Sequence, residues 1–279
     1  MIRVCIVGAN SYIGTAVKLA LNKQPDIFYA WEIDATSELL QIENADVVLH
    51  VAGIAHQKET KENVPLYMAV NCDLALSVAK QAKQAGVRQF IFLSSMSVYG
   101  LQSGHITKET LPAPNTAYGC SKLAAEQNLL PLQDDNFHLA ILRPPMIYGK
   151  GCLGNYPKLR NMLLKVPVFL ASNNERSMLY IEILTDFLTS LIQSGQSGLF
   201  FPQNKDYVAI AKLIDEISLA NHKKIWQIKG FGWLINILAK HIPIFTKLFA
   251  SLTYDKEMSQ SFRSPHEISF HDTIERTEG

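Results

Sequence analysis

The sequence predicts an α/β protein in which a doubly wound parallel sheet carries a smaller, mostly helical lobe. Over the first hundred residues, short apolar runs alternate with helix-like stretches, a pattern typical of β-α-β units. A glycine turn follows the first apolar run, at the edge where open α/β sheets bind ligands. After Gly149, loops containing Gly, Asn and Pro precede shorter helices, so we expect the second lobe to lie over the carboxyl edge of the sheet.

The individual elements follow from apolar runs and from helical spacing. Continuous apolar runs predict buried strands at Ile2–Val7 and at residues 46–51, 90–93 and 139–142. Helical spacing predicts helices at Tyr12–Asn22 and at residues 71–86 and 118–130. Gly86 and Pro131 end the last two of these helices. A short return to strand is expected at residues 195–202.

The composition excludes several classes of protein. Of the 279 residues, 48% are hydrophobic and 18% are charged, which excludes a disordered or low-complexity chain. Twenty-six basic residues against 25 acidic ones give a net charge of +1, so no global field would attract nucleic acid. The four cysteines form no C-x-x-C pair, so we expect neither a metal site nor a disulfide framework, and a reducing cytoplasm is the expected location.

A strongly apolar segment at residues 231–252 has about the length that spans a bilayer. Lys240, His241 and Lys247 interrupt it, and Pro243 would break a helix midway. We therefore expect two short helices packed on the protein, with an interfacial amphipathic anchor as the alternative. A membrane-spanning helix is disfavoured.

A glycine turn, Gly8-Ala9-Asn10-Ser11-Tyr12-Ile13-Gly14, follows the first predicted strand and opens the first predicted helix. In that setting, backbone N–H groups and the helix N-terminus present partial positive charge to a pyrophosphate. Gly8 allows the tight turn, and Gly14 allows close packing of helix on strand. The turn therefore predicts a dinucleotide site, and its contributing residues are Gly8, Asn10, Ser11, Tyr12, Ile13 and Gly14.

At this turn the chain resembles the extended short-chain dehydrogenase/reductase family, whose members share the spacing G-x-x-G-x-x-G. The resemblance implies a Rossmann-type sheet that binds NAD(P), formed by residues 1–148, and a substrate-binding lobe formed mainly by residues 149–279. Residues from about 180 to 202 would return to the Rossmann domain. Ser11 stands where the family has its middle glycine, and its Cβ would crowd the path of the pyrophosphate.

The ribose of the adenosine would be recognised by an acidic residue about 20 residues after the turn. Glu32 and Asp34 both fit this role, and Asp34 matches the family's aspartate beside the adenine. Residues 29–40 resemble one strand where the family usually has two. Because this stretch contains no arginine to receive a 2′-phosphate, NAD is favoured over NADP, which is not excluded.

Two further segments resemble cofactor-binding motifs of the family. In His50-Val51-Ala52-Gly53, the residues Val51, Ala52 and Gly53 would pack against the pyrophosphate and ribose at a strand end. Asn71 matches an asparagine on the helix that leads to the next strand, where it would support the central site. Taken alone, either segment would be a core-packing motif.

Tyr118 and Lys122 stand four residues apart on a predicted helix, and hence on one face of it. A nearby cation stabilises a phenolate, so Lys122 is expected to pull the pKa of Tyr118 toward working pH and to lie beside the nicotinamide. Tyr118 could then accept a proton as hydride leaves for the nicotinamide. Ser95 matches the family's catalytic serine and could hydrogen-bond the substrate oxygen. The competing interpretation is a solvated helix face and serines that cap a loop.

Ser95, Tyr118 and Lys122 are thus the predicted catalytic residues, and Ser95, Ser97 and Tyr118 would also contact the substrate. Nucleotide-sugar dehydratases of the family carry an Asp-Glu pair directly after the serine. This chain has Met96 and Ser97 there instead. Because a thioether cannot transfer protons, dehydration is disfavoured.

The second lobe contains matches to substrate-binding residues. Residues 143–149 resemble the family's Arg-Pro…Tyr-Gly motif, which begins this lobe. Asn155 is similar to an asparagine that contacts the diphosphate of a UDP-sugar. Arg176 resembles the arginine that grips the same diphosphate, a role that suits its planar guanidinium. A surface loop and a surface ion pair are the alternatives for these two residues.

The resemblance covers nearly the whole chain and points to UDP-sugar 4-epimerases and 4-ketosugar reductases of surface-polysaccharide synthesis. It implies a cytoplasmic, NAD-dependent epimerase that transfers hydride at C4 of a UDP-hexose or UDP-N-acetylhexosamine. One alternative is an NAD(P)H-dependent reductase of a UDP-4-keto-6-deoxy sugar, which would use the same residues. Another is a non-catalytic dinucleotide-binding regulator on the same fold. The resemblance also implies a homodimer formed through two helices of each subunit.

Overall fold

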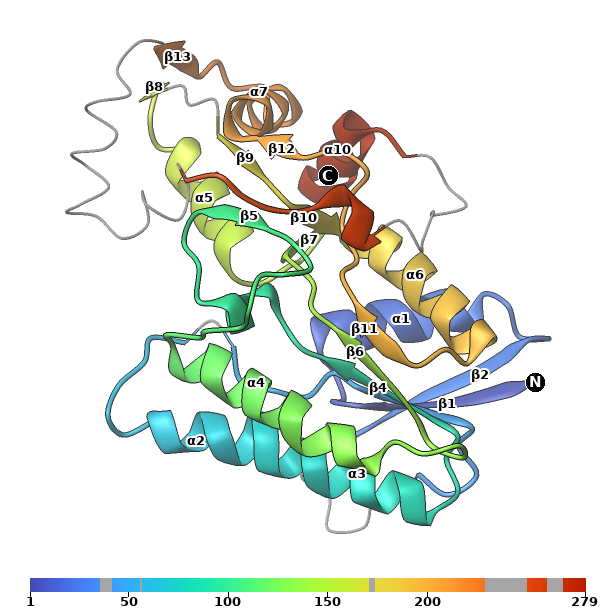
Figure 1. Ribbon diagram of the computed structural model, residues 1–279. Helices are drawn as coiled ribbons and strands as arrows, with labels where there is room; N and C mark the ends of the chain where they lie inside the picture. Colours follow the sequence, from blue (N-terminus) through green and yellow to red (C-terminus); the bar gives the residue numbers. More distant parts are fainter. Residues whose placement is uncertain (36–41, 56, 171–173, 229–249, 260–267) are drawn as a thin grey trace.

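A six-stranded parallel sheet organises the protein in the computed structural model, which describes residues 1–35, 42–55, 57–170, 174–228, 250–259 and 268–279 (Figure 1). The strand order is β11-β6-β4-β3-β1-β2, and every neighbouring pair is parallel. The strands are β1 (Ile2–Val7), β2 (Phe28–Ile33), β3 (Val47–His50), β4 (Gln89–Leu93), β6 (His138–Leu142) and β11 (Gly198–Phe200). The strand order reverses between β1 and β3, which is where ligands of such sheets bind.

Helices cover both faces of this sheet (Figure 1). On one face, α1 (Tyr12–Asn22) packs against α6 (Ile181–Ser194). On the other face lie α2 (Val64–Met68), a π-helix (Ala69–Asp73), α3 (Leu74–Gln84) and α4 (Ala117–Leu129). Side chains alternate between the faces along each strand, so Ile6, Leu49 and Ile91 join one apolar cluster, whereas Val48 and Phe90 join the other. The predicted Rossmann-type fold is therefore confirmed.

The predicted elements are found with changes at their ends. β1 and α1 have the predicted bounds. β2 begins at Phe28 and ends at Ile33, so Asp34 and Ala35 already lie outside it. The helix predicted from residue 71 begins earlier, at Val64, because a π-helical turn joins α2 to α3. The predicted return to strand at residues 195–202 is β11, which pairs with β6.

The second lobe combines helices with short strands that the sequence did not predict. Among the residues that the structure describes, its helices are α5 (Asn155–Leu163), α7 (Ile210–Ala220) and α10 (Phe270–Glu278). A four-stranded sheet has the order β12-β9-β14-β5, and its strands are β12 (Val208–Ala209), β9 (Glu175–Arg176), β14 (Leu252–Tyr254) and β5 (Gly104–Ile106). Two strand pairs complete the lobe: β7 (Met146–Tyr148) with β10 (Met178–Tyr180), and β8 (Val168–Leu170) with β13 (Trp226–Ile228). Strands of two or three residues carry too little alternation to be recognised in a sequence.

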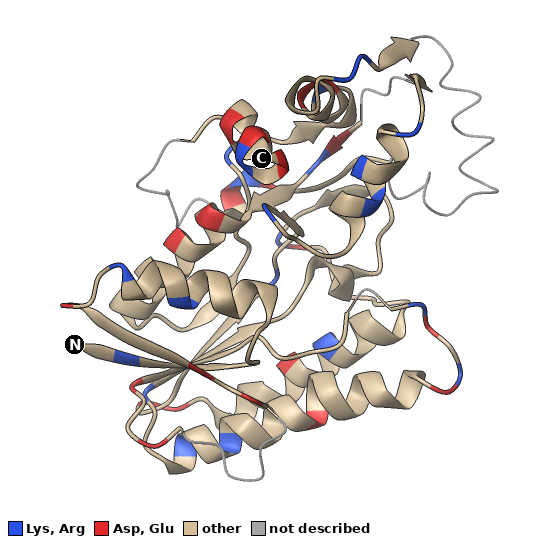
Figure 2. Cartoon of the chain, turned by 180° about the vertical axis from the view of Figure 1, so that it is seen from behind, with Lys and Arg blue, Asp and Glu red and all other residues tan. Residues whose placement is uncertain are grey.

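Most of the apolar segment at residues 231–252 lies outside the described residues, so the two short helices predicted there stay a prediction. Within the described ranges, no helix is long and apolar enough to cross a membrane. Basic and acidic residues are interspersed along the described elements of both lobes (Figure 2). This distribution agrees with the near-neutral charge of the sequence.

Candidate active site

The glycine turn lies against the strand-end motif, as the sequence predicted for two parts of one site. Gly8 has a φ of +126°, and a Cβ on it would stand 2.9 Å from the backbone nitrogen of Ala52. Ala52 and Val51 in turn donate their backbone N–H groups to the carbonyl of Val7 at 2.9 and 3.0 Å. The backbone of the turn therefore approaches the backbone of Ala52 so closely that a side chain on Gly8 would not fit. The turn lies where the strand order reverses.

Ser11 has a specific structural role in the turn. It is the N-cap of α1, and its hydroxyl accepts a hydrogen bond from the backbone N–H of Gly14 at 3.1 Å. At the start of a helix, such N–H groups are the donors that bind a phosphate. Ser11 therefore both adds a Cβ to the turn and occupies one donor that a pyrophosphate could use.

We expect Ser11→Gly to tighten binding of the dinucleotide, because it removes the Cβ and frees the N–H of Gly14. Calorimetric titration with NAD measures the effect, and a several-fold lower dissociation constant is the expected result. Ser269→Gly is the matched control, because Ser269 caps α10 in the same way through the N–H of Asp272. An unchanged dissociation constant in Ser11→Gly would show that the serine does not hinder the cofactor.

Glu32 and Asp34, the two candidates for ribose recognition, occupy different surroundings. The Glu32 carboxylate lies beside the turn, 3.3 Å from where a Cβ of Gly14 would stand. It accepts hydrogen bonds from the Thr15 hydroxyl at 3.2 Å and from Lys18 Nζ at 3.3 Å, both on α1. Asp34 is exposed, directly after the end of β2. Glu32 is thus the carboxylate that lies closer to the turn.

Asn71 joins the strand-end motif to the helix that carries Tyr118. Its side chain is fully buried in the π-helix, where Oδ1 accepts from the N–H of Ile54 at 2.7 Å. Nδ2 donates to the carbonyl of Ile54 and to the hydroxyl of Ser121, both at 3.0 Å. The Ser121 hydroxyl donates to the carbonyl of Tyr118 at 2.9 Å. The predicted supporting role of Asn71 therefore has a physical basis, and π-helical turns often occur at functional sites.

The start of α4 lies close to the segment that follows β4. Thr116 caps the helix by accepting from the N–H of Gly119 at 3.1 Å. A Cβ on Gly119 would stand only 2.6 Å from the carbonyl oxygen of Ser97, so glycine permits this close contact. The hydroxyl of Ser95 accepts from the N–H of Ser97 and donates to the Ser97 hydroxyl, both at 3.1 Å. The structure thereby brings Ser95 and Ser97 to the N-terminal turn of α4.

Tyr118 lies at this junction and hydrogen-bonds to Ser95. Burial raises the pKa of Tyr118 above its usual value, although its interaction with the Ser95 hydroxyl opposes that effect. From the i, i+4 spacing alone, Lys122 was expected to lower this pKa instead. That expectation is wrong for the protein's own groups, since burial dominates and Lys122 directs its ammonium elsewhere. The phenol is therefore in its neutral, proton-donating form over a wide range of pH.

Lys122 is buried below Tyr118, with 4% of its surface exposed. Its Nζ donates to the carbonyl of Leu93, at the end of β4, at 2.8 Å and lies 4.7 Å from the centre of the Phe92 ring. Burial lowers the pKa of Lys122 to about 8, whereas the charge of Glu126 acts to raise it. A Cβ on Gly53 would stand 3.4 Å from this Nζ, which places the ammonium beside the strand-end motif.

His50, at the end of β3, was quoted in the sequence analysis only as part of the strand-end motif. It is fully buried, and neither ring nitrogen has a hydrogen-bond partner within the described part of the chain. Its ring stacks 6.0 Å from the rings of Phe90 and Phe92. Burial and the charge of Lys122 lower the pKa of His50 to about 3. No sequence signal separates such a histidine from a hydrogen-bonded one, because its isolation depends on neighbours from other strands.

The predicted substrate residues of the second lobe lie apart from this cluster. Asn155 is exposed at the start of α5, after Gly154 with a φ of +96°. Arg176 lies in β9, where its Nη1 donates to the carbonyl of Ala250 at 2.7 Å and burial lowers its pKa to about 10. In the described ranges, neither side chain hydrogen-bonds to Ser95 or Tyr118. The structure thus groups the predicted catalytic residues but does not join these two to them.

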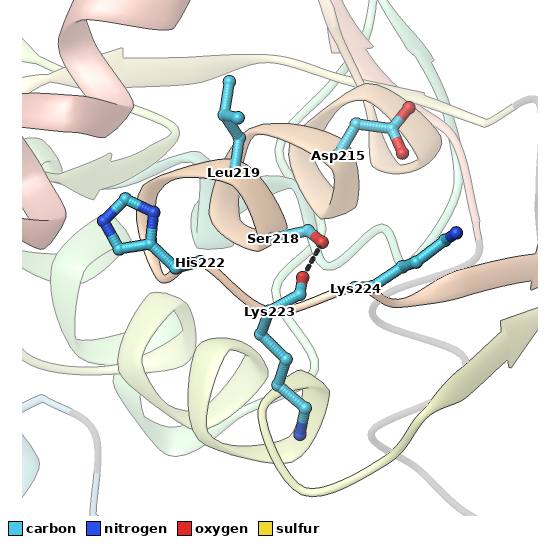
Figure 3. A pocket seen from close by; sticks show the side chains of 6 residues that line it. All are labelled: Asp215, Ser218, Leu219, His222, Lys223 and Lys224. Carbon is cyan, nitrogen blue, oxygen red and sulfur yellow. Dashed lines mark hydrogen bonds between the residues drawn. The ribbon is translucent and has the colours of Figure 1, made fainter.

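A separate recess of about 340 Å³ lies at the end of α7 (Figure 3). Asp215, Ser218, Leu219, His222, Lys223 and Lys224 line it. The Ser218 hydroxyl donates a hydrogen bond to the carbonyl of Lys223 (Figure 3). Helix α7 lies in the second lobe, away from α4 (Figure 1). In the described part of the chain, no group of three His, Cys, Asp or Glu side chains is placed to hold a metal ion. The predicted catalytic side chains therefore lie at α4 and not at this recess.

Comparison with known proteins shows the family to which the chain belongs. Residues 4–199 match the sequence model of the NAD dependent epimerase/dehydratase family. The chain belongs to this family. A relative in Vibrio cholerae described as UDP-glucose 4-epimerase is 32% identical over 241 residues, which cover 82% of this chain and 74% of the relative.

Solved structures agree with the family assignment at the level of the fold. A UDP-glucuronic acid 4-epimerase from Bacillus cereus in complex with NAD superposes with a TM-score of 0.76 at 18% identity, over 99% of this chain and 97% of that one. A dTDP-4-dehydrorhamnose reductase from Bacillus anthracis str. Ames in complex with NADP gives 0.75 at 19% identity, over 99% and 98%. The fold is thus shared by epimerases and reductases and by proteins that bind either dinucleotide.

Proposed function

We propose that the protein is an NAD-dependent nucleotide-sugar epimerase that transfers hydride at C4 of a UDP-hexose or UDP-N-acetylhexosamine. The observation that carries this proposal is that Tyr118 lies beside Ser95 after β4, while Lys122 Nζ binds the Leu93 carbonyl at the end of the same strand and lies beside Gly53 of the strand-end motif. A regulator that only binds a dinucleotide would have no need of this arrangement. The relationship to a UDP-glucose 4-epimerase in Vibrio cholerae supports the same activity.

NAD fits the residues that would hold it. Gly8, Gly14 and the N-terminus of α1 form the cradle for a pyrophosphate, together with Asn10, Ser11, Tyr12 and Ile13. Glu32 or Asp34 would accept from the adenosine ribose, and Val51, Ala52, Gly53, Asn71 and Lys122 would surround the nicotinamide half. NAD would supply the hydride acceptor. Because a carboxylate beside the turn would repel a 2′-phosphate, Glu32 favours NAD over NADP.

The residues of the chain would move the proton. The ionised form of Tyr118, which burial makes the minor form in the protein alone, would accept the proton of the C4 hydroxyl while the C4 hydride leaves, which gives a 4-keto sugar. Ser95 would hydrogen-bond the same oxygen and stabilise its developing charge. The keto sugar would turn over, receive the hydride on its other face and recover the proton from Tyr118. The reaction is thus neutral in electrons and protons, and no cofactor is consumed.

Reduction of a UDP-4-keto-6-deoxy sugar with NAD(P)H is the second candidate, and one observation favours it. The raised pKa of Tyr118 keeps the phenol protonated, which is the form that a reductase needs to protonate the substrate oxygen. The same three residues serve both reactions. The difference lies in whether external NAD(P)H is consumed.

A panel of UDP-sugars, with and without added NADH, separates these candidates when the products are read by mass and stereochemistry. Equal mass and inverted C4 without added cofactor support the epimerase. Oxidation of NADH with a gain of two mass units in a ketosugar supports the reductase. If no sugar of the panel reacts although NAD binds, the remaining candidate is a dinucleotide-binding regulator.

The surroundings of the site complete the proposal. We infer that residues 1–148 bind the dinucleotide, that residues 149–279 mainly bind the sugar, and that α6 and β11 return to the first domain. Asn155 and Arg176 would contact the diphosphate of the UDP-sugar. The protein would act in the cytoplasm in polysaccharide precursor synthesis, as a homodimer formed through two helices of each subunit.

A further inference from the structure

A buried ionic cluster lies beneath the loop that carries Ser95. Glu126 on α4 and Arg143 at the end of β6 form its centre, and their side chains are only 4% and 8% exposed. Arg143 Nη2 lies 2.6 Å from Glu126 Oε2, and Arg143 Nε donates to both carboxylate oxygens at 3.0 and 3.2 Å. Arg143 Nη1 donates to the hydroxyl of Tyr99 at 2.9 Å. A charged pair this deeply buried is stabilising only when its geometry satisfies both partners, as it does here.

This cluster is connected directly to the loop after β4. The hydroxyl of Ser94, the residue before Ser95, donates to Glu126 Oε1. The backbone N–H of Ser94 donates to the carbonyl of Leu142, and that of Met96 donates to the carbonyl of Pro144, at 2.7 and 2.9 Å. The backbone on both sides of Ser95 is therefore fixed. Of these three acceptors, the Glu126 carboxylate is the charged one.

Glu126 also acts on Lys122, which lies one helical turn before it on α4. The Glu126 carboxylate favours the protonated ammonium of Lys122 and opposes the effect of burial. His50 also lies near the Lys122 charge, but burial keeps it neutral, and the positive charge of Arg143 is paired with Glu126. Within the described residues, Glu126 is therefore the negative charge that acts on this lysine.

We propose that Glu126 is a positioning residue that fixes Ser95 through Ser94 and places a negative charge one helical turn from Lys122, with Arg143 and Tyr99 holding the carboxylate in place. This inference rests on the proposed function only in that Ser95 and Lys122 take part in the reaction. Arg143 also contacts the second lobe, because the Tyr254 hydroxyl donates to the backbone carbonyl of Arg143 at 2.9 Å. The cluster thus connects α4 to β14 of the second lobe.

The first test measures the titration of Lys122 in the protein without substrate. Protein labelled with [ε-13C]lysine reports the midpoint by NMR, and Lys122→Arg assigns the signal. In Glu126→Gln the midpoint is expected to fall by about one pH unit, because the neutral amide no longer favours the ammonium. Glu126→Asp keeps the charge and should retain the wild-type midpoint. Gln127→Ala, on the exposed face of α4, is the matched control.

The second test covers the case in which Glu126→Gln does not fold because Arg143 loses its partner. Ser94→Ala removes the link to the loop and leaves the ion pair intact. We expect kcat to fall about tenfold with an unchanged KM, which is the effect of a misplaced catalytic hydroxyl. The midpoint of Lys122 should not change in this variant. Wild-type kcat in Ser94→Ala would overturn the role in fixing Ser95.

The two measurements separate this inference from the proposed function. If no UDP-sugar reacts, the NMR midpoint still tests whether Glu126 keeps Lys122 charged. If the epimerase or reductase activity is found but the midpoint is the same in Glu126→Gln, the activity stands and the role of Glu126 is wrong. In an active enzyme, the alkaline limb of the kcat profile should move to lower pH in Glu126→Gln by the same amount as the midpoint.

Discussion

Tyr118→Phe is expected to lower kcat at least about 10²-fold while NAD affinity and the unfolding midpoint stay near their wild-type values. The phenol is the group that would exchange a proton with the C4 oxygen, and it lies against the Ser95 hydroxyl at the start of α4. Phenylalanine keeps the ring and its packing but removes the proton. Steady-state kinetics with the active UDP-sugar, calorimetric titration with NAD and urea unfolding measure the three quantities.

Tyr29→Phe is the matched control for this change. Tyr29 lies on β2 with 55% of its surface exposed, so the loss of its hydroxyl should leave kcat unaltered. If the Tyr118→Phe enzyme keeps full kcat, the proposal that Tyr118 transfers the proton is wrong. A Tyr118→Phe protein that unfolds earlier than wild type would instead assign the hydroxyl a structural role.

The parts of the site that could be predicted are those carried by local spacing. Residues four apart lie on one face of a helix, so Tyr118 and Lys122 share a face of α4. Gly8 and Gly14 stand at the two ends of a turn between a strand and a helix. Ser95 is the second residue after a buried strand. Because parallel strands place their carboxyl ends at one edge, these segments meet there once the sheet forms.

The parts that could not be predicted depend on contacts between distant segments. The i, i+4 spacing of Lys122 and Glu126 is visible in the sequence, but the pairing of Glu126 with Arg143 appears only when α4 packs beside β6. The direction of the Lys122 ammonium, toward the Leu93 carbonyl, likewise follows from packing. The expectation for the pKa of Tyr118 failed for this reason, since a helix face gives neither burial nor the direction of a long side chain.

The fold shows the same division. The core strands were predicted because both of their faces are buried, which leaves continuous apolar runs such as β4. The pairing of β5 with β14 joins residues near 105 to residues near 253, and three-residue strands leave no periodic pattern. The second lobe therefore needed tertiary information that the first did not.

His50 should make the protein sensitive to acid. Its pKa is about 3 in the folded protein, against about 6.5 for an unperturbed histidine, because it is fully buried and near the charge of Lys122. Between these two values the unfolded chain binds a proton that the folded protein does not. The free energy of unfolding therefore falls as pH drops below about 6.5, by up to about 1.4 kcal/mol per pH unit.

His50→Leu removes this titration and keeps an apolar side chain of similar size between the same strands. We expect its free energy of unfolding, measured in urea from pH 7 to pH 4, to decline less steeply than that of the wild type. At pH 4 the difference in decline should reach about 3 kcal/mol, because the proton uptake of His50 is absent. His105→Gln, at a half-exposed histidine on β5, should follow the wild-type curve. Parallel curves for the wild type and His50→Leu would mean that His50 titrates in the folded protein near its usual pKa. In that case groups other than the buried imidazole beside Lys122 would set the acid limit of stability.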